Sequence, residues 1–178
     1  MNVPNLLTVI RLFLIPIFIL VFFSTLENHL VWAVFIFILA GTTDVLDGYI
    51  ARKYNLVTKW GQVMDPLADK LMQLTVLTCL TIEGYIPIWI VIVYGIKEFT
   101  MIFGGIFLYT KKEKIVIPAN FFGKVSTLTF YLAVLSLVLD YNYSKYVFMV
   151  AISFAILAFI KYSVIGSNRL KQLKNDKS

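Results

Sequence analysis

Four aspartates lie in one short stretch of this sequence, among residues that are mostly apolar. Residues 44–69 contain Asp44, Asp47, Asp65 and Asp69, which are four of the ten acidic residues in a chain of 178. Carboxylates are costly to place in or beside a membrane, so residues of this kind usually serve a function. The stretch contains no histidine or cysteine, and oxygen-only ligands suit Mg²⁺, Mn²⁺ or Ca²⁺ better than zinc. The aspartates are therefore candidate ligands of hard divalent cations.

The spacing of these aspartates predicts two pairs, each on one face of a helix. Asp44 and Asp47 are three residues apart, and Asp65 and Asp69 are four apart. Residues at these separations share a helical face. The connection between the two pairs is short, so their helices should be antiparallel neighbours whose faces meet at one site. Two divalent ions about 3.5–4 Å apart could share four carboxylates, as in two-metal phosphoryl-transfer sites.

Small residues accompany the aspartates. Gly48 and Ala51 follow the first aspartate at i+4 and i+7, and Gly61 lies one turn before the third. The lack of side-chain bulk would let a large ligand approach the backbone. Arg52 adds a planar fork that suits phosphate oxygens. The pattern favours a site for a phosphate-containing ligand.

Two other interpretations of the aspartates stay open at this point. A single carboxylate pair at a helix end is usually a solvated face, although four aspartates with interleaved small residues fit that explanation poorly. Carboxylates inside a membrane also mark proton or cation pathways in transporters. Spacing alone does not separate a transporter from an enzyme.

The composition predicts what kind of elements position these residues. The chain is 60% hydrophobic and 15% charged, with a mean hydropathy of +0.83, which is more apolar side chain than a soluble domain of this length can bury. Apolar runs at repeated intervals predict an all-α, polytopic integral membrane protein with six transmembrane helices. The predicted spans are residues 5–24, 30–52, 60–82, 86–109, 121–139 and 146–165.

We expect one membrane domain over residues 1–178, with polar segments at both ends. The opening NVPNLLTVIR predicts an N-terminal interfacial segment before the first span, and Pro16 should kink or divide the helix. Residues 167–178 are polar and predict a short cytoplasmic helix that frays.

The basic residues predict the orientation in the membrane. Under the six-span arrangement, one side of the membrane receives Arg52, Lys53, Lys59, Lys111, Lys112, Lys114, Arg169, Lys171, Lys174 and Lys177. The opposite connections contain only Lys145. The positive-inside rule then places both termini and the aspartates on the cytoplasmic side of the cell membrane. The net charge of +6 is explained by these loops, and no compact basic module predicts nucleic-acid binding.

The arrangement Asp44-x-x-Asp47-Gly48-x-x-Ala51-Arg52, eight residues, Gly61-x-x-x-Asp65-x-x-x-Asp69 resembles the signature of the CDP-alcohol phosphotransferase family at every position. Eight defined residues in a 26-residue window make this a specific match. The length, the six-span layout and the opening NVPNLLTVIR are also similar to one branch of the family, the bacterial phosphatidylglycerophosphate synthases. The resemblance weakens after about residue 85.

The resemblance implies a donor, a cofactor and a set of roles. CDP-diacylglycerol would be the donor, and two divalent cations, Mg²⁺ or Mn²⁺, would be held by Asp44, Asp47, Asp65 and Asp69. Asp69 would also act as the general base, so that the acceptor oxygen attacks the lipid-side phosphorus and CMP leaves. The CDP and diphosphate site is implied at Asn5, Thr8, Gly48, Ala51, Arg52, Thr58 and Gly61. A homodimer is also a family-based expectation.

The acceptor site is expected elsewhere, around Lys97 and Lys124 in the cytoplasmic halves of the fourth and fifth spans. These lysines could hold the phosphate of glycerol 3-phosphate, which is the favoured acceptor. Alternatively, Lys97 or Lys70 neutralises Glu98 or an aspartate structurally. The run Gly-Lys-Val-Ser-Thr at residues 123–127 stands where the synthases have Gly-Lys-x-Lys-Thr, and it is also similar to the family's cardiolipin synthases. Cardiolipin synthesis from phosphatidylglycerol therefore stays an alternative, and a cation or proton transporter is the alternative from another class.

Overall fold

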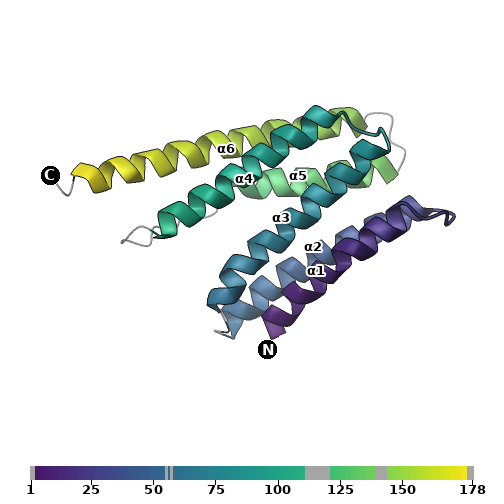
Figure 1. The fold of residues 1–178 in the computed structure, drawn as a ribbon, viewed down its shortest axis with the longest axis horizontal. Helices are drawn as coiled ribbons and strands as arrows, with labels where there is room; N and C mark the ends of the chain where they lie inside the picture. The colour runs from purple at the N-terminus through teal and green to yellow at the C-terminus, as the bar shows by residue number, and fades with distance from the viewer. Residues whose placement is uncertain (1–2, 55, 57, 111–120, 139–143, 176–178) are drawn as a thin grey trace. The chain divides into compact units, whose positions relative to one another are not determined.

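The computed structural model describes residues 3–54, 56, 58–110, 121–138 and 144–175. These residues form helices and short connections without a strand, so the predicted all-α class is confirmed. The helices are α1 (Val3–Phe22), α2 (His29–Lys53), α3 (Lys59–Ile82), α4 (Ile88–Thr110), α5 (Phe121–Val138) and α6 (Ser144–Asn175) (Figure 1). Each coincides with one predicted span to within a few residues, apart from the longer α6. The basic connection with Lys111, Lys112 and Lys114 lies outside the described residues.

The helices include segments that suit a lipid environment. Within the described residues, Val3–Phe22, His29–Ala51 and Ser144–Ile165 are long and apolar enough to cross a membrane, and Val125–Leu137 is a shorter apolar helix. Large apolar side chains on them are exposed, such as Leu20 at 73% and Val45 at 69%. Because such exposure is unfavourable in water but not in lipid, the chain is a membrane protein.

Helix α1 runs without a break from Val3 to Phe22 with Pro16 inside it. Pro16 therefore does not divide the helix, and the interfacial position of the opening residues stays a prediction. The buried residues of α1 recur every three or four positions along the whole length: Pro4, Thr8, Arg11, Leu14, Phe18 and Phe22. One continuous packed face offsets the hydrogen bond that Pro16 cannot make.

Met1–Val91 and Ile92–Ser178 form two compact units. In the first unit, α1 packs against both α2 and α3, and α2 also contacts α3 (Figure 1). Its core is apolar and includes Phe18, Phe37, Met72 and Val76. The three helices thus form a small bundle. The prediction of a single domain over residues 1–178 stays a prediction.

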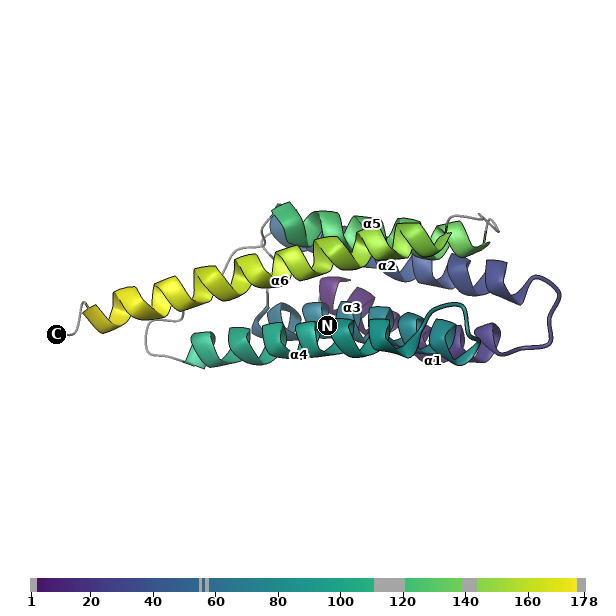
Figure 2. The same cartoon turned by 90° about the horizontal axis from the view of Figure 1, so that it is seen from above.

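In the second unit, α5 and α6 lie side by side (Figure 2). The ring of Tyr94 on α4 stacks on that of Phe130 on α5, with 5.5 Å between the ring centroids. Helix α6 continues to Asn175, so the described part of the polar tail extends the last helix and is not a separate short one.

Candidate active site

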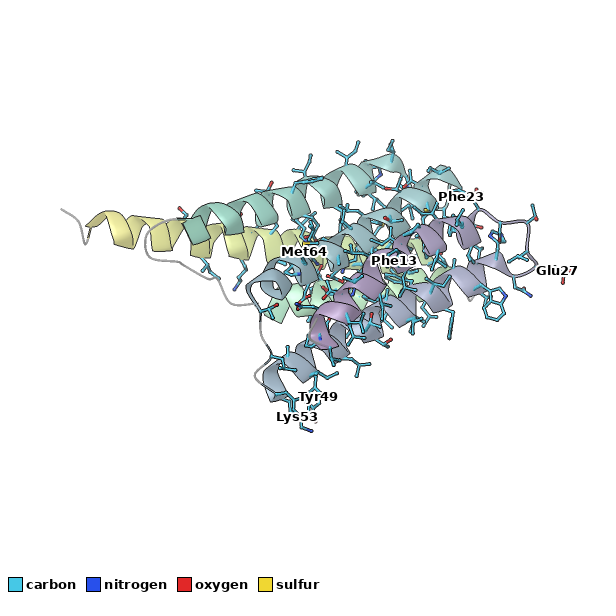
Figure 3. The ribbon with its side chains drawn as sticks, turned by 60° about the horizontal axis from the view of Figure 1, so that its bottom comes forward. Phe13, Phe23, Glu27, Tyr49, Lys53 and Met64 are labelled. Atoms are coloured by element: carbon cyan, nitrogen blue, oxygen red, sulfur yellow. The ribbon has the colours of Figure 1, made fainter. Side chains whose placement is uncertain are left out.

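The polar residues of the first unit gather where α1, α2 and α3 meet, near the carboxyl end of α2. Tyr49 and Lys53 mark this end of α2 in Figure 3, and Glu27 lies beyond the other end. Helix α1 contributes Thr8 and Arg11, which are three residues apart on its buried face. In an otherwise apolar bundle, buried polar groups of this kind must find partners in each other.

Arg11 links the three helices. Its side chain is 1% exposed. Nη1 lies 2.8 Å from Oδ1 of Asp44, and Nη2 lies 2.6 Å from Oδ2 of Asp47. Nε also donates to the carbonyl of Ala40, and Nη1 donates to the carbonyl of Asp65, each at 3.3 Å. A single guanidinium therefore holds both aspartates of α2 and the backbone of α3.

Thr8 and Asn5 of α1 contact the start of α3. The hydroxyl of Thr8 donates to Oδ1 of Asp65. The hydroxyl of Thr58 donates to Oδ1 of Asn5 at 2.9 Å and accepts the backbone N–H of Gly61 at 2.9 Å, which makes Thr58 the N-cap of α3. The N-terminal turns of α1 and α3 are thus joined by side-chain hydrogen bonds.

Gly61 is surrounded by these same groups. A Cβ atom at this position would lie 3.1 Å from Oγ1 of Thr58, 3.2 Å from Oδ1 of Asn5 and 3.3 Å from Oδ2 of Asp65. All three distances are shorter than ordinary van der Waals contact. A glycine here therefore lets the polar side chains of α1 and α3 approach one another closely.

Asp69 has its own set of partners. Nε2 of Gln73, one turn later, donates to both carboxylate oxygens of Asp69 at 3.0 Å, and Nζ of Lys70 lies 3.2 Å from Oδ2. Gln73 itself is completely buried. Lys70 thus neutralises an aspartate, as the structural alternative for this residue predicted.

The two aspartate pairs lie within electrostatic range of each other. Electrostatic repulsion acts between Asp44 and Asp69, and between Asp47 and Asp65. Within the described residues, no three acidic, histidine or cysteine side chains are grouped closely enough to hold one metal ion. Between Asp44 and Asp47 the space is taken by the guanidinium of Arg11.

The donor chemistry nevertheless fits a hard divalent cation. Four carboxylates face two described cationic partners, Arg11 and Lys70, which leaves a formal charge of −2. Uncompensated carboxylate charge in a partly buried site favours the binding of cations. Oxygen ligands without nitrogen or sulfur are those that Mg²⁺ and Mn²⁺ prefer.

Comparison with known proteins agrees with the signature of residues 44–69. A model of the CDP-alcohol phosphatidyltransferase family matches residues 1–158. The chain belongs to this family. The match extends through both compact units and beyond the aspartate signature, so the family assignment does not rest on one motif.

Several similar family members have names that specify an acceptor. A CDP-diacylglycerol--glycerol-3-phosphate 3-phosphatidyltransferase of Bacillus subtilis (strain 168) is 38% identical over 151 residues, which cover 78% of this chain and 77% of that protein. A protein of the same name from Aquifex aeolicus (strain VF5) is 38% identical over 152 residues, with 82% of each covered. A Mycobacterium bovis protein (strain ATCC BAA-935 / AF2122/97), provisionally named as a cardiolipin synthase, is 34% identical over 130 residues, with 73% of this chain and 61% of that protein covered.

The structure gives fewer details for the other predicted site residues. Gly48 and Ala51 lie on α2 after Asp47 and are half-buried. Arg52 and Lys124 belong to α2 and α5, but their side chains lie outside the described part of the chain.

Lys97 belongs to the second unit and is buried there. Its Nζ lies 2.5 Å from Oε1 of Glu98 and 4.6 Å from the centre of the Tyr94 ring. The pairing with Glu98 is the one that the structural alternative for Lys97 predicted. A charge at this depth is stabilised by its partner and by the aromatic ring.

Sequence reasoning missed two residues of the site, Arg11 and Gln73. A signal existed for each. Arg11 continues the spacing of Asn5 and Thr8 along one helical face, and Gln73 lies one turn after Asp69 in an otherwise apolar run. Both act on the aspartates through their side chains, and neither is part of the family signature.

Proposed function

We propose that this protein transfers a phosphatidyl group from CDP-diacylglycerol to a hydroxyl of glycerol 3-phosphate, forming phosphatidylglycerophosphate and releasing CMP. The observation that carries the proposal is the meeting of the signature residues of α2 and α3 with the polar face of α1. The names of the relatives from Bacillus subtilis and Aquifex aeolicus support glycerol 3-phosphate as the acceptor.

The four aspartates would hold two divalent cations, Mg²⁺ or Mn²⁺. When bound, these ions would neutralise the diphosphate of the donor and the charge that develops on the leaving CMP. Asp44, Asp47 and Asp65 would be the main ligands, and Asp69 would be a ligand of the second ion. Carboxylates from two packed helices give such ligands fixed positions before the substrate arrives.

Asp69 would be the general base. Gln73 orients its carboxylate by donating to both oxygens, and Nζ of Lys70 lies 3.2 Å from Oδ2. In the reaction, Asp69 takes the proton of the acceptor hydroxyl as that oxygen forms a bond to the lipid-side phosphorus. The bond from this phosphorus to the oxygen of the CMP phosphate breaks, and CMP leaves with the bonding electrons.

The nucleotide would bind along α1 and the start of α3. Asn5 and Thr8 reach this region from α1, and Thr58 and Gly61 reach it from α3. These hydroxyl, amide and backbone groups can exchange their present hydrogen bonds for bonds to ribose and phosphate oxygens. Gly48, Ala51 and Arg52 would complete the site from α2.

The membrane arrangement is part of the proposal. Six spans, with both termini and the aspartates facing the cytoplasm, would let CDP and glycerol 3-phosphate reach the site from water while the acyl chains stay in lipid. The segregation of basic residues supports this orientation. Lys124 would hold the acceptor phosphate, whereas Lys97 is paired with Glu98. A homodimer stays a prediction.

An acceptor panel tests the proposed reaction. Purified protein is given CDP-diacylglycerol with Mg²⁺ or Mn²⁺ and, in separate reactions, glycerol 3-phosphate, phosphatidylglycerol, serine or inositol phosphate. We expect CMP release and a lipid product with glycerol 3-phosphate, and loss of turnover with EDTA or in Asp69→Asn. Unchanged turnover in Asp69→Asn would contradict the assignment of the base.

Two other outcomes would replace the proposal. A product formed only with phosphatidylglycerol would identify a cardiolipin synthase. This is the second candidate because residues 123–127 and the name of the Mycobacterium bovis relative both favour it. Ion flux in liposomes without CMP release for any acceptor would identify a transporter.

A further inference from the structure

Arg11 is a charged side chain buried in the middle of a membrane helix. It is 1% exposed, and its helix is otherwise almost entirely apolar. An arginine at such depth is stable only if other groups neutralise it and accept its hydrogen bonds. Among the groups described, Asp44 and Asp47 neutralise Arg11. These two carboxylates and two backbone carbonyls accept its hydrogen bonds.

The guanidinium of Arg11 lies against two of the proposed metal ligands. Its two terminal nitrogens lie 2.8 Å from Asp44 and 2.6 Å from Asp47. The fork thus bridges the same two carboxylates that the proposed function assigns to a metal ion. A cation placed between these carboxylates would compete with the guanidinium for the same oxygens and would be repelled by its charge.

The charges of the site make this competition effective. With Arg11 and Lys70 in place, the four aspartates keep a formal charge of −2, whereas removal of Arg11 would leave −3. A site with one more negative charge binds a divalent cation more tightly. Without Arg11, however, Asp47 would be a buried carboxylate with no described cation beside it.

We propose that Arg11 is a stand-in for a divalent cation. It bridges Asp44 and Asp47, and a divalent cation that takes these carboxylates must displace it from at least one of them. Arg11 therefore holds the two aspartates together and lowers the metal affinity of the site. Arg11 is in this sense a positioning residue, and the inference rests on the proposed function in taking the aspartates as metal ligands.

The test measures Mn²⁺ binding to the full-length protein in detergent, without substrate. We expect Arg11→Met to bind Mn²⁺ about tenfold more tightly than the wild type, because one repelling charge is gone. Thermal unfolding of Arg11→Met should occur at a clearly lower temperature than wild type in EDTA, and Mn²⁺ should restore most of the difference. Unchanged or weaker Mn²⁺ binding, with equal loss of stability in EDTA and Mn²⁺, would mean that Arg11 is only structural.

Two further variants keep the result interpretable. Lys53→Met also removes one positive charge from this end of α2, but Lys53 is exposed and lies over the rings of Tyr49 and Tyr54. It should leave Mn²⁺ affinity unchanged. Arg11→Lys keeps the charge without the fork that bridges two carboxylates, so it should bind Mn²⁺ more tightly than wild type but less tightly than Arg11→Met. If Arg11→Met does not fold, unchanged or weaker binding in Arg11→Lys overturns the proposal.

The same measurement separates this inference from the proposed function. A wild-type protein that binds no Mn²⁺, together with an Arg11→Met variant that binds none, would remove the metal site and with it the proposed reaction. A wild-type protein that binds Mn²⁺ and releases CMP, with no tighter binding in Arg11→Met, would overturn only the role of Arg11.

Discussion

Gln73 is a neutral residue that acts on a charged one. Its side chain is completely buried, and its Nε2 donates to both oxygens of Asp69 at 3.0 Å. A carboxylate held through both oxygens has little freedom to rotate. A general base must point at the hydroxyl that it deprotonates, so in the proposed reaction the amide of Gln73 would help to set the direction of Asp69.

Replacing this amide with an apolar side chain of similar size tests its contribution. Gln73→Leu should lower kcat about tenfold or more, since a hydrogen bond to a charged group is worth about 1.5–3 kcal/mol. The KM for CDP-diacylglycerol should change little, because Gln73 contacts the proposed base and not the residues proposed to bind the nucleotide. Steady-state CMP release measures both constants.

A control for Gln73→Leu is available on the same helix. Thr78 is exposed on α3 and bonds only to the carbonyl of Leu74 among the contacts described, so Thr78→Val should keep wild-type kinetics. A Gln73→Leu enzyme with wild-type kcat would show that the orientation of Asp69 does not depend on the Gln73 amide.

At the scale of the helices, Thr58 connects two elements. It caps α3 by accepting the N–H of Gly61, and it ties α3 to α1 through Asn5. The hydroxyl satisfies a backbone donor that would otherwise lack a partner at the start of the helix. Thr58 therefore helps to fix the aspartate-bearing end of α3, together with Thr8 and Arg11.

We expect Thr58→Val to lower the unfolding free energy by about 1 kcal/mol, which is the usual loss on removing an N-cap. It should also raise the KM for CDP-diacylglycerol, because Asn5 loses its partner. Thr58→Ser keeps the hydroxyl and should behave like the wild type in thermal unfolding and in kinetics. Wild-type stability and kinetics in Thr58→Val would show that the hydroxyl is not needed.

The helices and the aspartate pairs were predictable for a common reason. Apolar runs of membrane length mark the helices, and separations of three and four residues place Asp44 with Asp47 and Asp65 with Asp69. Both depend only on residues close in the sequence. The sequence left open whether Pro16 kinks or divides the helix, because Pro16 and Arg11 interrupt the apolar pattern. In the structure, packing along one face keeps α1 continuous.

The contacts between helices were not predictable in the same way. Arg11 reaches Asp47, which is 36 residues away in the sequence, and this depends on how α1 is rotated against α2. In a soluble protein the polar face would indicate the rotation. In a membrane helix the faces toward lipid and toward the core are both apolar, so the pattern leaves the rotation open.

For the molecule as a whole, the orientation in the membrane can be tested at the two ends of α2. Lys53 and Glu27 lie at opposite ends (Figure 3) and are exposed. The native Cys79 is buried, and Cys79→Ser gives a background without thiols. In that background, Lys53→Cys should react with a membrane-impermeant maleimide only from the cytoplasmic side.

Glu27→Cys should react from the opposite side under the same conditions. Right-side-out cells and inverted vesicles provide the two sides, and labelling after detergent treatment confirms that both thiols can react. Labelling of both variants from the same side would rule out the assignment of α2 as a span.

The bridge between Arg11 and the aspartates also has a consequence for how the chain is made. Helix α1 leaves the ribosome before α2, so Arg11 enters the insertion machinery while Asp44 and Asp47 have not yet been synthesised. An unpaired arginine at the centre of a membrane helix costs about 2.5–3.5 kcal/mol on insertion scales. The favourable route is for α1 to wait at the translocation channel and enter lipid together with α2 as a hairpin. The residues that assemble the site would then also set the order in which the membrane receives the first two helices.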